Sequence, residues 1–351
     1  MPPPRAQPVD ENAVTLDTGY GSDKNGIVWA YGFLPGQAAR EIDSATALEL
    51  IEANRTAQDG GFVWIHLSSS NVASEPWLRR HLNLPDIFYE ALHAESASTR
   101  VEQESEGLVS VVHDVVFDST FDSSDVSTVC LCIDPRLLVS VRRRPLRSID
   151  RLRGAVKAGN PFSSPAGLLG QLLRDQAHVL SEILRDATLK VDAAEDRLLE
   201  NRITVSRREL GSLRRVLVRL QRLLVPEPAA LFRLLNRPPS WINADDLQDL
   251  RQAAEEFSSA LVDSGTLVER IKLLQEEIAA LVNEDTSRTL FVLTVVTVLA
   301  LPINLIAGLF GMNVGGIPLA SHPHGFLLIV GLVASMTAIL AWLALGRRRD
   351  R

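Results

Sequence analysis

The 351-residue sequence has only two cysteines, Cys130 and Cys132. So small a number excludes a disulfide-rich secreted fold. The N-terminus begins Met-Pro-Pro-Pro-Arg and has no apolar stretch of the length that a secretory signal needs, so we expect the soluble part to stay in the cytoplasm. The sequence also has no phosphate-cradling glycine loop, nucleophile elbow or metalloprotease motif, so we expect neither an enzyme nor a bound cofactor.

Charge is missing from one long part of the chain. No Asp, Glu, Lys or Arg occurs in the 58 residues from Thr289 to Gly346. The last 67 residues carry a net charge of +3, whereas residues 1–284 carry −10. An acidic soluble body is therefore joined to an apolar, weakly basic tail.

Residues 26–165 are predicted to form a cytoplasmic α/β domain, preceded by a poorly ordered polar extension at residues 1–25. Short runs rich in β-branched and aromatic residues predict strands, and helix-spaced apolar residues lie between some of them. The strands are predicted at 27–31, 62–67, 108–117, 126–133 and 137–141, and the helices at 44–53 and 76–94. The order of the strands does not follow from these patterns.

Residues 166–288 are predicted to form a helical region that ends in a long stalk helix. Helices are expected at 169–201 and 207–225, and prolines bound a short link before the stalk, for which Asn243 is a suitable N-cap. The stalk carries apolar residues in steps of three and four, a coiled-coil pattern that favours association of several such helices. These positions are Leu247, Leu250, Ala254, Phe257, Leu261, Ser264, Val268, Ile271, Gln275, Ile278 and Val282. One helix of about 100 Å is predicted from about Asp245 to Phe310.

Two apolar segments predict a pair of transmembrane helices, at 289–310 and 326–346. Each is about 30 Å long as a helix, which is enough to cross a bilayer core. The outer loop at 311–325 is too short to cross again, and the basic tail at 347–351 holds four arginines. Positive flanks remain inside, so both termini are expected on the cytoplasmic side of the inner (plasma) membrane. The alternative is a membrane-anchored binding domain without transport.

The first transmembrane helix carries a stripe of polar and small residues. At about 100° per residue, six residues fall within about 60° of Asn304. They are Leu290, Leu293, Thr297, Leu301, Gly308 and Gly311. An amide facing lipid is unfavourable, so Asn304 is expected to face a water-filled path, or alternatively to join helices by hydrogen bonds. Two helices cannot enclose a path for a hydrated ion, so a pore requires several subunits.

The first apolar helix ends in Leu309-Phe310-Gly311-Met312-Asn313, and Gly315-Gly316-Ile317-Pro318 follows. The Gly-Met-Asn triplet, placed after a long helix and at the end of the first of two C-terminal spans, resembles the signature of the CorA metal-ion transporter family. The longer string is most similar to the zinc-transporting ZntB branch of that family.

The resemblance implies a funnel-shaped homopentamer whose first transmembrane helices line a central pore. Gly311, Met312 and Asn313 would form the selectivity ring at the pore mouth, where the Asn313 amides hold a hydrated dication through its water shell. The pore-lining residues would be the polar Asn304 and Thr297, Gly308, and the hydrophobic Leu290, Leu293 and Leu301. The expected partners are copies of this chain, divalent cations and the lipid bilayer, with no nucleic acid.

The outer loop favours zinc as the transported substrate. It has no acidic residue after Val314 but offers His322 and His324, and imidazole suits Zn²⁺ better than Mg²⁺. A histidine in an exposed loop is also simply a polar residue, so a magnesium, cobalt or nickel channel remains the alternative. The resemblance implies proton-coupled zinc uptake, although efflux has also been associated with that branch.

Two further groups have alternative readings. Cys130 and Cys132 lie on one face of a predicted strand, either as buried small residues or as a zinc-binding pair. The basic run Arg142-Arg143-Arg144, with Arg147, Arg151 and Arg153, predicts a solvated or subunit-contact loop in preference to a nucleic-acid site.

Overall fold

The computed structural model describes residues 21–56, 61–94, 99–104, 107–116, 126–200, 207–312 and 323–346. Most of the N-terminal extension, Asn313, His322 and the basic tail lie outside the described residues. The chain divides into two compact units, one of Met1–Glu200 with Thr204–Lys272 and one of Asn201–Ile203 with Leu273–Arg351.

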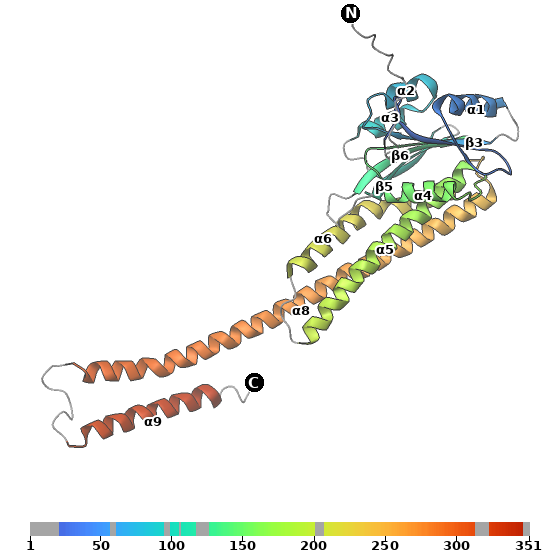
Figure 1. Cartoon of the computed structure of the whole chain (residues 1–351). Coiled ribbons are helices and arrows are strands. Elements are labelled where there is room, and N and C mark those ends of the chain that lie inside the picture. Colours follow the sequence, from blue (N-terminus) through green and yellow to red (C-terminus); the bar gives the residue numbers. More distant parts are fainter. Residues whose placement is uncertain are drawn as a thin grey trace, which may run out of the picture. The chain divides into compact units, whose positions relative to one another are not determined.

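A mixed sheet of seven strands is the centre of the first unit (Figure 1). The strand order is β2-β1-β3-β7-β6-β5-β4. The strands are β1 (Ile27–Phe33), β2 (Arg40–Ile42), β3 (Phe62–Ser68), β4 (Arg100–Glu104), β5 (Gly107–Val115), β6 (Val126–Asp134) and β7 (Leu137–Arg142). Strands β3 and β7 pair in parallel, and the other neighbouring strands pair antiparallel.

Helices cover both faces of the sheet, which explains why the central strand β3 is apolar almost throughout. Val63, Ile65 and Leu67 belong to a core shared with α1 (Ser44–Thr56), α2 (Ser74–His81) and α3 (Asp86–His93). Phe62 and Trp64 point the opposite way, because side chains alternate along a strand. They join a core formed with α4 (Arg147–Lys157), α5 (Pro165–Leu199), α7 (Pro226–Asn236) and the beginning of α8.

The long stalk helix is confirmed as α8 (Ala244–Phe310), 67 residues without a break. The predicted N-cap is also confirmed, since the Asn243 side-chain oxygen accepts a hydrogen bond of 2.7 Å from the backbone N–H of Asp246. Pro302 lies inside the helix and does not end it. The second apolar segment forms α9 (Gly325–Gly346).

The coiled-coil seam of α8 is used inside the chain over its first part. Leu250, Phe257 and Ile271 are buried. Gly170 of α5 lies against Leu250, since a Cβ there would be in ordinary van der Waals contact with the Leu250 side chain at 3.8 Å. Gly265 lies against α6 (Arg207–Leu224), since a Cβ there would be 3.1 Å from the Gln221 side chain. These seam residues therefore pack on α5 and α6, and their pattern alone does not require association between chains.

Three local predictions were wrong or incomplete. The helix expected at 76–94 is two helices, α2 and α3, separated before Pro85, which has no N–H to continue a helix. The proline-bounded link before the stalk forms α7, because Pro226 occupies the first turn, where no N–H is needed. The short edge strands β2 and β4 were not predicted, since three and five mostly polar residues give no clear alternation.

Candidate functional site

The second part of α8 presents the residues of the predicted ion path. Leu290, Leu293 and Leu301 are 57%, 61% and 67% exposed in the single chain. By length and composition α8 is able to cross a membrane, and the described part of α9 contains a shorter apolar stretch, Gly325–Leu340. Large apolar side chains exposed over this length need a cover of lipid or protein.

The helical phase on which the predicted stripe depends is present in the structure. Because α8 continues as a helix through Pro302, residues three, four and seven apart stay on one side of it. Thr297, Leu301 and Asn304 therefore share a face, and each is exposed. The structure therefore brings these stripe residues together on one side of a single helix.

The threonine hydroxyls of this region are already oriented by the helix. The Thr297 hydroxyl donates a hydrogen bond of 2.8 Å to the carbonyl of Leu293, and Thr294 donates in the same way to Leu290. A hydroxyl has one proton and two lone pairs, so its oxygen remains able to accept. Thr297 can therefore accept a hydrogen bond from a water molecule in a cation's hydration shell.

The end of α8 is shaped by glycine. The Gly311 N–H donates a bond of 2.9 Å to the carbonyl of Ala307. A Cβ at Gly311 would lie 2.9 Å from that same oxygen, so a larger residue would displace the helix end. At Gly308 a Cβ would meet nothing within 4 Å in the single chain. Met312, the next residue, is 52% exposed.

The predicted metal ligands are only partly within the described chain. Asn313 and His322 lie outside it, and His324 lies in the turn before α9, where its carbonyl accepts a hydrogen bond from the Leu328 N–H. Among the residues that the structure describes, no group of three or more His, Cys, Asp or Glu side chains is placed to hold a metal ion. The possible histidine site stays a prediction.

The cysteines are buried small residues, as one of the two readings expected. Cys130 and Cys132 lie in β6, 4% and 6% exposed, and belong to the core under α2 and α3. Burial raises the pKa of the Cys130 thiol to about 11 and that of Cys132 to about 12. Both are thiols at neutral pH, and within the described residues they belong to no group of three or more side chains that could hold a metal ion.

The basic run is in part the solvated loop that was expected. Arg143 and Arg144 are exposed in the bend between β7 and α4, whereas Arg142 is buried at the end of β7 and Arg147, Arg151 and Arg153 belong to α4. The Arg153 guanidinium lies over the Trp29 ring, 4.3 Å from its centroid, and forms an ion pair of 3.4 Å with Glu41. Arg153 therefore links α4 to strands β1 and β2.

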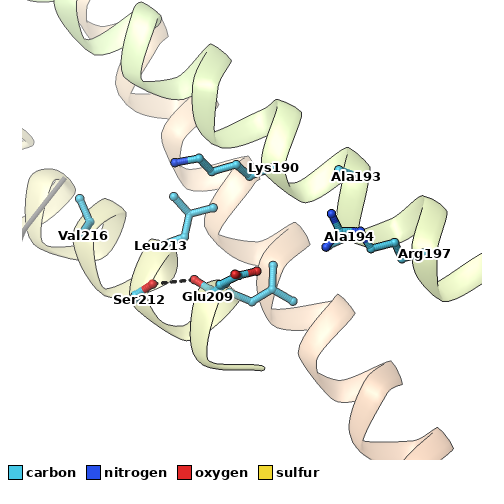
Figure 2. A pocket seen from close by; sticks show the side chains of 9 residues that line it. Lys190, Ala193, Ala194, Arg197, Glu209, Ser212, Leu213 and Val216 are labelled. Atoms are coloured by element: carbon cyan, nitrogen blue, oxygen red, sulfur yellow. Dashed lines mark hydrogen bonds between the residues drawn. The ribbon is translucent and has the colours of Figure 1, made fainter. Parts of the chain in front are cut away.

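A groove of about 350 Å³ lies between α5 and α6, and Figure 2 shows the side chains that line it. Lys190 and Arg197 come from α5, and Glu209, Leu213 and Val216 come from α6. The Ser212 hydroxyl is turned back to the carbonyl of Glu209, at 2.8 Å. The groove combines both signs of charge with apolar walls and contains no predicted site residue.

Sequence reasoning missed a group of buried polar residues beside the sheet. Asp114 of β5 and Glu227 at the start of α7 are buried, as is His66 of β3. A sequence signal existed for two of them. His113-Asp114 interrupts an apolar strand, and Glu227 lies between two prolines at a helix start.

Comparison with known proteins decides the family. A family model described as CorA-like Mg²⁺ transporter protein matches residues 59–348. The chain belongs to this CorA family. The resemblance seen in the Gly-Met-Asn segment is thereby confirmed, and so is the expectation of a divalent-cation transporter that is not an enzyme.

Individual CorA-family relatives cover most of the chain. The zinc transport protein ZntB of Pectobacterium atrosepticum is 29% identical over 279 residues, which cover 80% of this chain and 85% of the relative. The structure of the full-length CmaX protein is similar with a TM-score of 0.77 at 25% identity, covering 93% of this chain and 99% of that one. The CorA magnesium transporter of Methanocaldococcus jannaschii has a TM-score of 0.70 at 19% identity, covering 90% and 96% of the two chains. The fold of an α/β domain with a long helix is thus that of the CorA family.

Proposed function

We propose that this chain is one subunit of a homo-oligomer, a pentamer, that carries zinc across the inner (plasma) membrane through a central pore. The observation that supports it most is the second part of α8. It is a charge-free helix that leaves the stalk without a break, bears Thr297 and Asn304 on one face, and is followed directly by Gly311 and Met312. The two apolar helices α8 and α9 would both span the membrane.

Zinc is proposed as the substrate because curated relatives at 25–29% identity are named zinc transport proteins. The histidines of the outer loop agree with this preference. Magnesium is the substrate named for a structural relative of the same fold, so a magnesium, cobalt or nickel channel is the second candidate. An anchored binding domain without transport is the third, and the family assignment counts against it.

Proton coupling is part of the proposal because the resemblance to the ZntB branch implies it, and the sequence offers no nucleotide-binding motif that would drive transport instead. A dication moving inward across about −100 mV gains about 4.6 kcal/mol, because each charge contributes about 2.3 kcal/mol. Inward flux is therefore favoured even without a proton gradient, and a pH gradient would add to it.

The test is metal flux into proteoliposomes that contain the purified full-length protein. Zn²⁺, Mg²⁺, Co²⁺ and Ni²⁺ are offered separately, with and without a pH gradient. We expect Zn²⁺ flux that rises when the outside is acidic. Flux of Mg²⁺ without Zn²⁺ would identify a magnesium-type channel. Zn²⁺ flux that does not change with the pH gradient would exclude proton coupling. If no metal is transported, the chain would be the membrane-anchored binding domain without transport.

A further inference from the structure

The first unit contains a buried polar junction where the sheet meets four helices. Asp114 and His113 come from β5, Ser148 from α4, Gln176 from α5 and Glu227 from α7. Thr99, just before β4, links His113 at 2.8 Å to the carbonyl of Leu223 in α6 at 3.4 Å. These five side chains from β5, α4, α5 and α7 are all buried. A charge on any titratable side chain of this group therefore costs far more free energy than a charge on the surface.

The two acidic side chains of the junction, Asp114 and Glu227, differ in the hydrogen bonds that they accept. Asp114 accepts hydrogen bonds from the Val115 N–H at 2.7 Å, the Ser148 N–H at 2.9 Å and the Ser148 hydroxyl at 2.8 Å. Burial is the largest influence on Asp114 and raises its pKa to about 6, although these three donors favour the ionised form. Glu227 is 0% exposed and receives the Gln176 amide only at 3.4 Å. Its other oxygen, Oε2, has no hydrogen-bond partner.

No positive charge compensates Glu227. Besides burial, hydrogen bonds from Gln176 and from the backbone of His113 favour the ionised form of Glu227, the Asp114 charge disfavours it, and no arginine or lysine of the described chain takes part. The His113 imidazole is not a cation either, because burial lowers its pKa. Asp150 of α4 acts unfavourably on the charge of Asp114. Asp175 of α5 is influenced by Arg151, His178 and Arg174 and not by Glu227.

We propose that Glu227 is a proton-binding site, occupied at neutral pH, and that loss of this proton loosens the junction between the sheet and helices α5 and α7. The bond formed on protonation is O–H on the unpartnered oxygen, and the proton comes from water. A neutral acid needs no counter-charge, whereas an ionised one would face the Asp114 carboxylate across a dry interior. Burial, the largest cause, raises the pKa of Glu227 well above its usual value, in agreement with this state.

The sign of the pH effect follows from the direction of that shift. A carboxyl whose pKa is raised by folding binds its proton more tightly in the folded chain. The stabilisation is complete below the unfolded pKa of 4.5 and is lost as the pH rises toward the folded pKa. Within that window the unfolding equilibrium constant should increase by about tenfold per pH unit for one such group. Alkaline conditions therefore weaken the packing of α5 and α7 on the sheet.

The first test is infrared spectroscopy of the full-length protein at neutral pH. We expect the carbonyl band of a protonated carboxylic acid that is shielded from water, and we expect Glu227→Gln to remove part of it. Asp175→Asn is the matched control, because it deletes a second buried carboxyl of raised pKa from α5. In Asp175→Asn, the part of the infrared band that comes from Glu227 should remain. An unchanged band in Glu227→Gln would overturn the proposal.

The second test is the thermal midpoint of the same proteins from pH 5 to pH 9. Gln resembles the neutral acid, so Glu227→Gln should match the original protein at low pH and become the more stable one as the pH rises. A variant destabilised equally at every pH would mean that Glu227 is ionised, and the proposal would fail. If Glu227→Gln does not fold, the infrared band is titrated in Asp175→Asn, and absence of a buried carboxylic acid band at neutral pH in that variant would overturn the proposal. Neither readout depends on metal transport, so a failure here is distinct from a failure of the proposed function.

Discussion

Asn313 is the residue on which the proposed selectivity depends most. Its amide offers one acceptor and one NH₂ donor, so in a ring the acceptors can meet the water shell while the donors brace neighbouring side chains. Asn313→Ala removes both groups and leaves the backbone. We expect zinc flux to be nearly abolished, while oligomeric mass and thermal midpoint stay close to the original values, because little packing is lost at a wet mouth.

Asn313→Asp provides the matched comparison for this prediction. A ring of carboxylates should still bind the cation but release it slowly, so flux should fall while binding persists. If Asn313 only shapes the helix end, Asn313→Ala should lose stability in parallel with transport. A correctly assembled Asn313→Ala protein that carries zinc at the original rate would exclude the residue from the mechanism.

Thr297 tests the stripe itself, because α8 contains a natural control. Thr294 donates the same bond to the carbonyl four residues earlier as Thr297 does, at the same 2.8 Å. By helical phase Thr294 lies about 80° from Asn304, outside the stripe, whereas Thr297 lies about 20° from it. Valine replaces the hydroxyl at nearly equal size. One lost hydrogen bond of ~1 kcal/mol should reduce flux by roughly fivefold in Thr297→Val. Equal loss in Thr294→Val would mean that the hydroxyls act on helix stability and not on the ion.

At the scale of whole elements, the starts of α5 and α8 are joined by one carboxylate. The Asp246 side chain accepts hydrogen bonds from the Ser164 hydroxyl at 2.6 Å and from the Asn243 amide at 2.8 Å. Ser164 also caps α5 by accepting from the Gly167 N–H at 2.9 Å. Asp246 therefore orients the capping residues of both helices.

Loss of this link should lower stability measurably. We expect Asp246→Ala to reduce the free energy of unfolding by ~1–2 kcal/mol, since it disturbs two caps. Asp245→Ala is the control, because Asp245 is exposed in the same first turn and should change stability by less than ~0.5 kcal/mol. Chemical denaturation in detergent, followed by tryptophan fluorescence, measures both. Equal effects would assign the stabilisation to the helix dipole alone.

Long elements with a strong pattern could be predicted from the sequence, and short or polar ones could not. Helix α8 was placed within one residue at its start, because Asn243 and a long unbroken periodicity mark it. The parallel pairing of β3 with β7 could not be predicted, since it joins segments more than 70 residues apart. Glu227 was missed because its neighbours Asp114 and Gln176 are remote in sequence, and only the fold brings them together.

At the scale of the whole molecule, the proposal includes two membrane spans with both termini inside. Ser321→Cys should then react with an impermeant thiol reagent added outside intact cells. The native thiols provide a low background, because Cys130 and Cys132 are buried and their pKa values are raised. Labelling only after the cells are opened would reverse the proposed topology.

Part of the proposed site could not be predicted from one chain, since its remaining walls would come from other copies.

Helix α8 carries both the coiled-coil seam and the stripe that ends at Gly311. In a continuous helix, the angle between two side chains depends on the number of residues between them, at about 100° per residue. One residue inserted after Asn283 would rotate everything beyond it by about 100°, whereas seven inserted residues would return the stripe to within about 20° of its first direction. We expect the insertion of one residue to abolish transport. The insertion of seven residues should largely restore it, although it lengthens the helix by about 10 Å. A protein that tolerates either insertion equally well would not depend on the direction in which its polar stripe faces.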